Sequence, residues 1–278
     1  MTPRDFDLHC HTNVSDGFLA PAELLQLASE SGIKTLAITD HDSVDAYRQL
    51  HLQMPASCRT RLLPAVEMAC NWEQNEIHVV GLDIDPLASA ITSVLDKQQA
   101  VRYERASQIH LAIEKFGVNG LRPVFTEVLG QGVPGRLHFA RALVENGNAK
   151  DVGRAFKQIL NKVKTARRHS WVDLEEAVAS IQAAGGIAIL AHPHAYGFTR
   201  SKLGRLVAAF VDACGDGLEV SSPGADSERM AQLSRYCQEF DLLASGGSDF
   251  HGLPGSWRKL GFFPELPRDC SSVWTAIQ

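Results

Sequence analysis

Six histidines and three acidic residues stand in short polar motifs spread over nearly the whole chain. The longest motifs are Asp7-Leu8-His9-Cys10-His11, Thr39-Asp40-His41-Asp42 and Gly247-Ser248-Asp249-Phe250-His251. Imidazole nitrogens and carboxylate oxygens are the usual ligands of divalent metals of intermediate softness. We therefore predict a site for two or three clustered ions, which is the equipment of phosphoester hydrolysis. The nine candidate metal ligands are His9, His11, Asp16, His41, Glu67, His78, His192, Asp249 and His251.

Most of these motifs follow a short apolar run that is typical of a buried strand. Residues 35–39 lead to His41, and residues 187–191 lead to His192. In parallel α/β folds the chemistry sits at the carboxyl ends of the strands, so these motifs are expected to meet at one end of the molecule. Side chains alternate along a strand, so His9 and His11 should share one side, with Cys10 on the other as a buried structural thiol.

Two more acidic residues, Asp40 and Asp42, flank His41. One of them is expected to accept a hydrogen bond from the His41 ring nitrogen that does not bind metal. That carboxylate would orient the ring without binding the ion itself. The alternative for Asp42 is that it caps the helix that follows.

The periodicity predicts seven strands with helices between them, interrupted by a long helical insertion. The strands are expected at Phe6–Leu8 and at 35–39, 61–67, 76–83, 187–191, 217–221 and 242–246, with helices at 21–31, 43–54, 173–184, 201–213 and 226–240. Within the insertion, helices are expected at 89–116, 123–130, 136–146 and 151–161. This order divides the chain into a first barrel part (1–87), a helical lid or substrate domain (88–170) and a second barrel part (171–278).

Composition sets further bounds. The chain has 278 residues, 45% of them apolar, and no uninterrupted apolar stretch long enough for a membrane span. The six cysteines are scattered and the N-terminus lacks a signal-like segment, so free thiols and a cytoplasmic location are expected. The net charge is −5, but the charges are unevenly distributed along the chain. Residues 88–170 carry 14 Lys or Arg and only 6 Asp or Glu. Such a basic segment can attract a phosphorylated ligand, although a solvated helical surface is the plainer interpretation.

Taken in order, these motifs resemble the polymerase and histidinol phosphatase (PHP) superfamily over residues 5–83 and 186–251. The resemblance implies a distorted seven-stranded (β/α) barrel with a helical insertion and a trinuclear metal centre. It also implies how the ligands are shared. One ion would take His9, His11, Glu67 and Asp249; a second would take Glu67, His78 and His192; a third would take Asp16, His41 and His251.

The insertion resembles one subgroup of that superfamily, through the stretches Gly135–Val144 and Arg102–Arg105. The subgroup acts on nucleoside 3′,5′-bisphosphates and on short RNA from its 5′ end. Four substrate-binding candidates follow, and Arg136 could clamp a phosphate through paired donors. For Arg136 the alternative is a surface ion pair, and for His138 it is a packing role. The four candidates are Arg102, Arg105, Arg136 and His138.

We therefore expect a metal-dependent phosphatase that removes the 3′-phosphate of nucleoside 3′,5′-bisphosphates with metal-activated water. The alternatives are a 5′-3′ exoribonuclease on short RNA and a histidinol-phosphate phosphatase. A non-catalytic PHP module is the alternative from another class, and the full ligand set disfavours it. Mixed His and carboxylate ligands favour Mn²⁺, with Fe²⁺ or Zn²⁺ possible. The expected partner is a small phosphorylated nucleotide or short single-stranded RNA, with neither a membrane nor a nucleic-acid duplex involved.

Overall fold

The computed structural model describes residues 4–54, 58–163, 170–252, 254 and 256–277. Within these residues nine strands form two sheets. The first sheet is parallel, with the order β1 (Phe6–Cys10), β2 (Thr35–Ile38) and β3 (Arg61–Leu63). The second is mixed, with the order β6 (Val172–Asp173), β4 (Ala65–Trp72), β5 (Asn75–Leu82), β7 (Ile187–Leu190), β8 (Gly217–Ser221) and β9 (Leu243–Gly246).

The expected number of seven strands is wrong for the described part of the chain, for two local reasons. Pro64 divides the expected strand 61–67 into β3 and β4, which belong to different sheets, because proline cannot donate to a ladder. The two residues of β6 then add a short strand beside β4. The β4–β5 pair is antiparallel because only Glu73 and Gln74 connect the two strands.

The hydrogen bonds join the strands into two separate sheets, so the α/β class is confirmed while a closed barrel is not. The sheets meet at the loops that carry the candidate ligands. On one side the Asp249 N–H donates to the His9 carbonyl at 2.8 Å, and on the other the Asp42 N–H donates to the Glu67 carbonyl at 2.8 Å. Apolar side chains from both sheets, such as Leu8, Val80 and Ile189, share one buried cluster between them.

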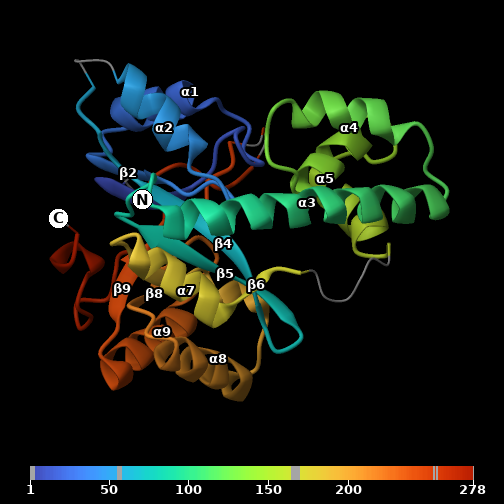
Figure 1. Ribbon diagram of the computed structural model, residues 1–278. Coiled ribbons are helices and arrows are strands. Elements are labelled where there is room, and N and C mark those ends of the chain that lie inside the picture. The colour runs from blue at the N-terminus through green and yellow to red at the C-terminus, as the bar shows by residue number, and fades with distance from the viewer. Residues whose placement is uncertain (1–3, 55–57, 164–169, 253, 255, 278) are drawn as a thin grey trace.

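Helices cover the outer faces of the sheets (Figure 1). Leu24 of the first helix and Leu50 of the second pack on the first sheet, and Ile181 and Leu233 pack on the second. The observed α-helices begin and end within two residues of their expected bounds, except that the helix expected at 151–161 is divided into a short α-helix at Val152–Ala155 and a π-helical turn at Phe156–Leu160. The five covering helices are α1 (Pro21–Glu30), α2 (Asp45–Gln53), α7 (Leu174–Ala183), α8 (Arg200–Asp212) and α9 (Ser227–Phe240), with short 3₁₀ turns η2 (Pro193–Tyr196) and η3 (Val273–Thr275).

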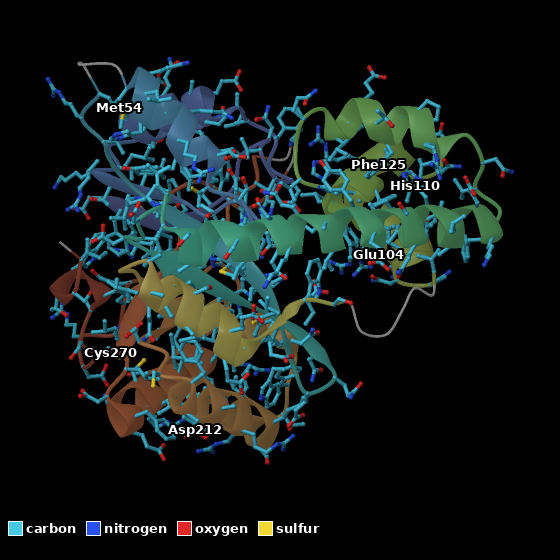
Figure 2. All side chains as sticks on the ribbon, in the orientation of Figure 1. Met54, Glu104, His110, Phe125, Asp212 and Cys270 are labelled. Atoms are coloured by element: carbon cyan, nitrogen blue, oxygen red, sulfur yellow. The ribbon has the colours of Figure 1, made fainter. Side chains whose placement is uncertain are left out.

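The long helix α3 (Ser89–Lys115) runs out from the sheets and carries the remaining helices on its far half (Figure 1). Its first half contributes Ile91 and Leu95 to the core beside β4, and its second half contributes Ile109 and Ile113 to a separate helical core. His110 and Phe125 lie against each other in this second core, with ring centroids 4.6 Å apart (Figure 2). The helical core is completed by α4 (Leu121–Leu129), α5 (Arg136–Glu145), α6 (Val152–Ala155) and the π-helical turn η1 (Phe156–Leu160).

The cysteines are all free, as expected from their spacing. Cys10 is buried and its thiol donates to the Ala37 carbonyl at 3.2 Å, which confirms its structural role opposite His9 and His11. None of the helices in the described residues combines the length and the apolar character needed to cross a bilayer.

Candidate metal centre

The fold brings all nine candidate ligands to one end of the two sheets. His9 lies at the end of β1 with His11 just beyond it, and Glu67 and His78 lie within the neighbouring strands β4 and β5. The other five come from the loops after β1, β2, β7 and β9. Two of the strands that carry residues of the centre are irregular. The β1–β2 register shifts between Asp7 and Cys10, and the β8–β9 register shifts between Glu219 and Ser221. Such bulges re-aim side chains near functional sites.

Backbone strain and a close contact mark the same loops. His192 and Asp249 have positive φ angles of 30° and 47°, a conformation that side-chain-bearing residues rarely adopt. Gly247 packs directly on β1, and a Cβ atom there would lie 2.3 Å from the Cβ of His9. Only glycine allows the chain to approach β1 this closely and deliver Asp249 next to His9.

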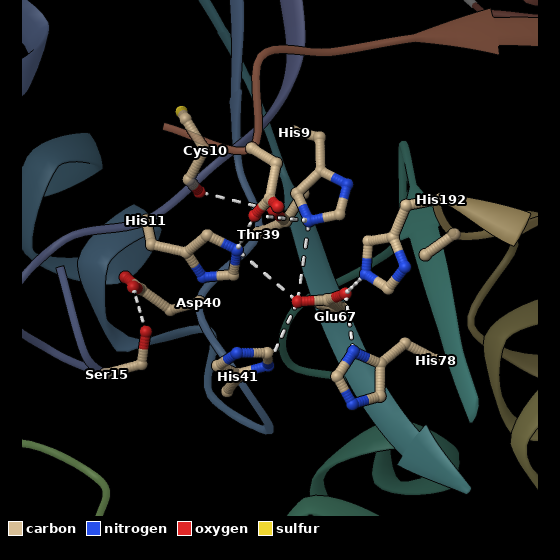
Figure 3. Close-up of polar contacts among 12 residues, drawn as sticks. His9, Cys10, His11, Ser15, Thr39, Asp40, His41, Glu67, His78 and His192 are labelled. Atoms are coloured by element: carbon tan, nitrogen blue, oxygen red, sulfur yellow. Dashed lines mark hydrogen bonds and ion pairs between the residues drawn. The ribbon is translucent and has the colours of Figure 1, made fainter. Parts of the chain in front are cut away.

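Glu67 stands at the middle of the centre and is fully buried (Figure 3). Its Oε1 lies 2.9 Å from His78 Nδ1 and 2.9 Å from His192 Nε2, while its Oε2 lies 2.9 Å from His41 Nδ1. The same Oε2 is 3.3 Å from His11 Nε2 and 3.4 Å from His9 Nε2. One carboxylate therefore faces five imidazoles, with a different set at each oxygen, as a bridging ligand requires.

Ligand atoms close enough to share an ion occur in four overlapping groups. The groups are His11, Asp16, His41 and His251; His9, Glu67 and His192; His9, His11 and Asp249; and His41, Glu67 and His78. The first group contains the three ligands predicted for the third ion, together with His11. The third group contains the ligands predicted for the first ion, without Glu67.

Several buried polar atoms in this space lack a hydrogen-bond partner within the described residues. They include Nε2 of His9, both ring nitrogens of His11, Oδ1 of Asp16 and Oε2 of Glu67. An unpartnered buried polar atom costs about 1–3 kcal/mol, so a cluster of them indicates a ligand that satisfies them. The residues therefore fit a set of divalent ions.

The electrostatics of the centre differ from one ligand to the next. Burial, together with the neighbouring His251, lowers the pKa of His11 to about 3, so its ring is neutral at physiological pH. Burial opposes ionisation of Glu67, but the surrounding His41, His78 and His9 hold its pKa well below the usual range. Burial would likewise lower the pKa of His78, yet the Glu67 carboxylate raises it to about 10. A divalent ion bound by His78 would take the place of this proton, because a metal-ligating imidazole must be neutral.

Glu219, which was not among the predicted site residues, orients His9. This buried carboxylate of β8 lies 2.7 Å from His9 Nδ1 and accepts the His192 backbone N–H at 3.2 Å. A carboxylate on one imidazole nitrogen turns the other nitrogen toward a metal and makes it more basic. The available signal was a glutamate in the middle of the apolar strand 217–221.

The predicted orienting roles of Asp40 and Asp42 are wrong within the described contacts. Asp40 accepts hydrogen bonds from the Thr12 N–H at 2.8 Å and from the Ser15 hydroxyl at 2.6 Å, so it holds the loop before Asp16. Asp42 also does not cap α2, whose N-cap is Val44.

Asp42 instead anchors the long helix to the centre. Its carboxylate accepts from Arg102 Nε at 2.6 Å, from Gln98 Nε2 at 3.2 Å and from the Ala69 N–H at 3.1 Å. Arg102 is buried, and its guanidinium also lies 5.3 Å from the Trp171 ring centroid. Its Nε is therefore committed to the fold, which departs from the predicted contact with substrate.

Arg105 and Arg136 line one cavity of about 390 Å³ between α3, α5 and η1. Arg105 pairs with Glu76 at 3.1 Å. Arg136 donates to the Leu160 carbonyl at 3.0 Å and to the Asn161 side chain at 2.9 Å. These two predicted candidates therefore point into a common space beside the centre.

His138 is buried, and its Nδ1 accepts the Gly135 N–H at 3.0 Å. Burial lowers its pKa to about 4, so the ring is neutral and caps the N-terminus of α5. This contact agrees with the packing alternative, and the predicted phosphate contact stays a prediction. The neighbouring backbone is tight, since a Cβ on Gly135 would lie 3.0 Å from Asp16 Oδ2.

Arg258 is a second residue that the prediction missed. Its guanidinium contacts the Asp249 carboxylate and donates to the Asp249 carbonyl at 3.1 Å. The side chain is partly exposed at the edge of the centre, where an arginine can also meet phosphate oxygens.

An α/β fold that gathers imidazoles and carboxylates at its strand ends is the arrangement of a metal-dependent phosphoesterase. Comparison with known proteins places the chain within that class. Residues 7–122 match the model of the PHP domain. The 5′-3′ exoribonuclease of Haemophilus influenzae is 37% identical over 272 residues, which cover 98% of each chain. The 3′,5′-nucleoside bisphosphate phosphatase of Chromobacterium violaceum is 33% identical over 282 residues, covering 99% of this chain and 96% of its own. This chain belongs to the PHP domain family.

A solved structure supports the assignment. An amidohydrolase from Chromobacterium violaceum, with bound sulfate and no metal, superposes with a TM-score of 0.89 at 34% identity. The match covers 98% of this chain and 95% of that one, so the helical segment is included in the likeness.

Proposed function

We propose that this phosphoesterase removes the 3′-phosphate of nucleoside 3′,5′-bisphosphates, leaving a nucleoside 5′-phosphate. The observation that carries the proposal is the pairing of two features. The centre built around Glu67 suits phosphoester hydrolysis, and the cavity of Arg105 and Arg136 beside it suits a second phosphate. The relative from Chromobacterium violaceum is named for this activity.

The nine clustered residues would hold two or three divalent ions, and we propose Mn²⁺, with Fe²⁺ and Zn²⁺ as the alternatives that mixed nitrogen and oxygen ligands also suit. Bound ions would supply an activated water and neutralise the phosphate charge. Glu67 offers its two oxygens to different groups of histidines, and Glu219 holds the His9 ring in place. Arg258 stands where it can bind the reacting phosphate. We further infer that the two sheets are halves of one distorted barrel and that residues 88–170 form a substrate domain over it.

Hydrolysis of short RNA from the 5′ end is the second candidate, because the relative from Haemophilus influenzae is named for it. The two activities share one bond change. Water adds to phosphorus, the bond from phosphorus to O3′ breaks, and the 3′-hydroxyl takes a proton. In the bisphosphate the phosphorus leaves as inorganic phosphate, and in RNA it stays on the next nucleotide.

A substrate screen tests the proposal. Purified protein with Mn²⁺ should release phosphate from a nucleoside 3′,5′-bisphosphate faster than from 3′- or 5′-mononucleotides or histidinol phosphate, and the nucleotide product should be the 5′-phosphate. A 5′-phosphorylated RNA oligomer should yield 5′-mononucleotides one at a time. A clear preference for histidinol phosphate would contradict the proposal.

Arg136→Ala tests the second-phosphate site. Loss of a charge-assisted clamp of about 2–3 kcal/mol should lower kcat/KM for the bisphosphate roughly 30- to 150-fold. An aryl phosphate without a second phosphate should change much less. Arg122→Ala, on the exposed face of α4, is the matched control. Equal losses on both substrates would show that Arg136 serves the reacting phosphate or the fold.

A further inference from the structure

A groove of about 700 Å³ beside the metal centre carries two exposed aromatic rings. Phe18 is 45% exposed and Trp257 is 69% exposed, and both line this groove. Large rings left open to water are costly for a chain that could have packed them, so their sharing one concave surface indicates a binding role. We call this surface the aromatic groove. Its lining also includes Arg141, Glu145, Lys150 and Asp151.

The aromatic groove begins next to the candidate ligands. The Phe18 N–H donates to the His251 carbonyl at 2.7 Å, and Phe18 follows Asp16 by two residues. Trp257, which also lines the groove, precedes Arg258, whose guanidinium contacts Asp249. A nucleic-acid strand bound at the metal centre would therefore have the groove directly beside it.

Each ring has an arginine against it. The Arg141 guanidinium lies 5.2 Å from the Phe18 ring centroid, and the Arg258 guanidinium lies 5.7 Å from that of Trp257. Paired rings and guanidinium groups are what single-stranded nucleic acid requires, because bases stack on the rings and the cations meet the phosphates between them. Lys150 and Arg141 in the lining are balanced by Glu145 and Asp151, so stacking rather than net charge dominates.

The proposed chemistry leaves a place for such a ligand. In both reactions the 5′-terminal nucleoside lies on the O3′ side of the reacting phosphorus, and its 5′-phosphate would occupy the cavity of Arg105 and Arg136. A bisphosphate carries nothing on the other side of the phosphorus. RNA carries its second nucleotide there, and that nucleotide needs a surface of its own.

We propose that the aromatic groove binds the second and following nucleotides of single-stranded RNA by stacking their bases on Phe18 and Trp257. The proposal rests on the proposed function and adds the part of the site that separates an RNA substrate from a bisphosphate. It assigns Phe18 and Trp257 to substrate selection rather than to bond cleavage.

The test compares two substrates in the holoenzyme loaded with Mn²⁺. Trp257→Ala and Phe18→Ala should each lower kcat/KM for a 5′-phosphorylated RNA tetramer about 5- to 100-fold, since base stacking on one aromatic ring is of that size. For a nucleoside 3′,5′-bisphosphate the same variants should change kcat/KM by less than about a factor of two. Trp257→Phe keeps a ring and should retain most of the activity on RNA. Phe116→Ala removes a ring that is 46% exposed at the end of α3, outside the groove, and should leave both substrates unaffected.

A binding measurement separates this proposal from the proposed function. Trp257 is the most exposed large apolar side chain of the groove, so an RNA tetramer with a cleavage-resistant first linkage should quench its fluorescence in the wild type and not in Trp257→Phe. Quenching without any bisphosphate hydrolysis would keep the groove and overturn the proposed function. Bisphosphate hydrolysis with no quenching and no selective loss on RNA would overturn the groove. Equal losses on both substrates would also overturn it, because the rings would then serve the centre itself.

Discussion

Glu219 determines how one histidine faces the metal centre. It is a buried carboxylate in an otherwise apolar strand, and it lies 2.7 Å from His9 Nδ1. Because the same oxygen also accepts the His192 backbone N–H, this carboxylate holds two candidate ligands in register. A residue of this kind matters for catalysis without touching the substrate.

Glu219→Gln should lower kcat/KM about 10- to 100-fold, because an amide controls the His9 tautomer less strictly and makes the ring less basic. Bound metal, measured on the purified variant by elemental analysis, should fall while far-ultraviolet circular dichroism stays unchanged. Glu239→Gln on the exposed face of α9 is the control. Wild-type metal content together with wild-type rate would refute the orienting role.

The nine candidate ligands could be predicted because their residue types, His and carboxylate at strand ends, carry the chemistry themselves. Glu219 and Arg258 could not be found in the same way. The role of Glu219 depends on a neighbour 210 residues away, and Arg258 follows the last motif in a stretch without a strand pattern. The capping role of His138 could not be found either, because its Nδ1 bonds to the Gly135 N–H only once α5 has formed.

At the scale of elements, the Asp42–Arg102 pair ties the helix α3 to the loop that carries His41. Both side chains are buried and 2.6 Å apart, and the Asp42 N–H also holds the carbonyl of Glu67. A buried ion pair of this kind is costly to break from one side, because the remaining charge keeps no partner.

Arg102→Met should therefore destabilise the protein by about 3–5 kcal/mol in urea unfolding. Adding Asp42→Asn to that variant should restore part of the loss, since the uncompensated charge is removed. Arg154→Met, at an exposed position of α6, should change little. If the effects of Arg102→Met and Asp42→Asn simply add, the two residues are not coupled and the anchoring role is wrong.

The helices were largely predictable, because apolar periodicity places all but one within two residues of its observed bounds, the exception being the helix expected at 151–161, which is divided in two. The sheet arrangement was less so. Pro64 was visible in the sequence, but its effect, a change from one sheet to the other, depends on strands elsewhere in the chain. Asp42 likewise pairs with Arg102, 60 residues away in the sequence, and local capping rules cannot predict such a contact.

For the molecule as a whole, the metal centre is a local source of instability when no ion is bound. Nine ionisable side chains lie together at the end of the sheets, several with unpartnered atoms, and ions would offset that cost. The native state should therefore depend on metal for part of its stability, by mass action.

Removal of metal with a chelator should lower Tm by roughly 5–15 °C, and added Mn²⁺ should restore it. Differential scanning calorimetry gives this shift independently of any substrate. Asp249→Ala should respond much less to the chelator than the wild type does. A wild-type Tm that is identical with and without chelator would argue against ions bound by these residues.

The length of helix α3 sets the distance between the two cores that it joins. Its 27 residues join the core beside β4 to the helical core, and Arg102 and Arg105 lie between the two ends. One residue added or removed in its middle would turn everything beyond it by about 100° and shift it about 1.5 Å along the axis. Arg105 would then leave its cavity, and α5 would carry Arg136 out of that cavity and Arg141 out of the aromatic groove. Substitutions along this helix can keep that spacing, whereas an insertion or a deletion would change where Arg136 lies relative to the centre.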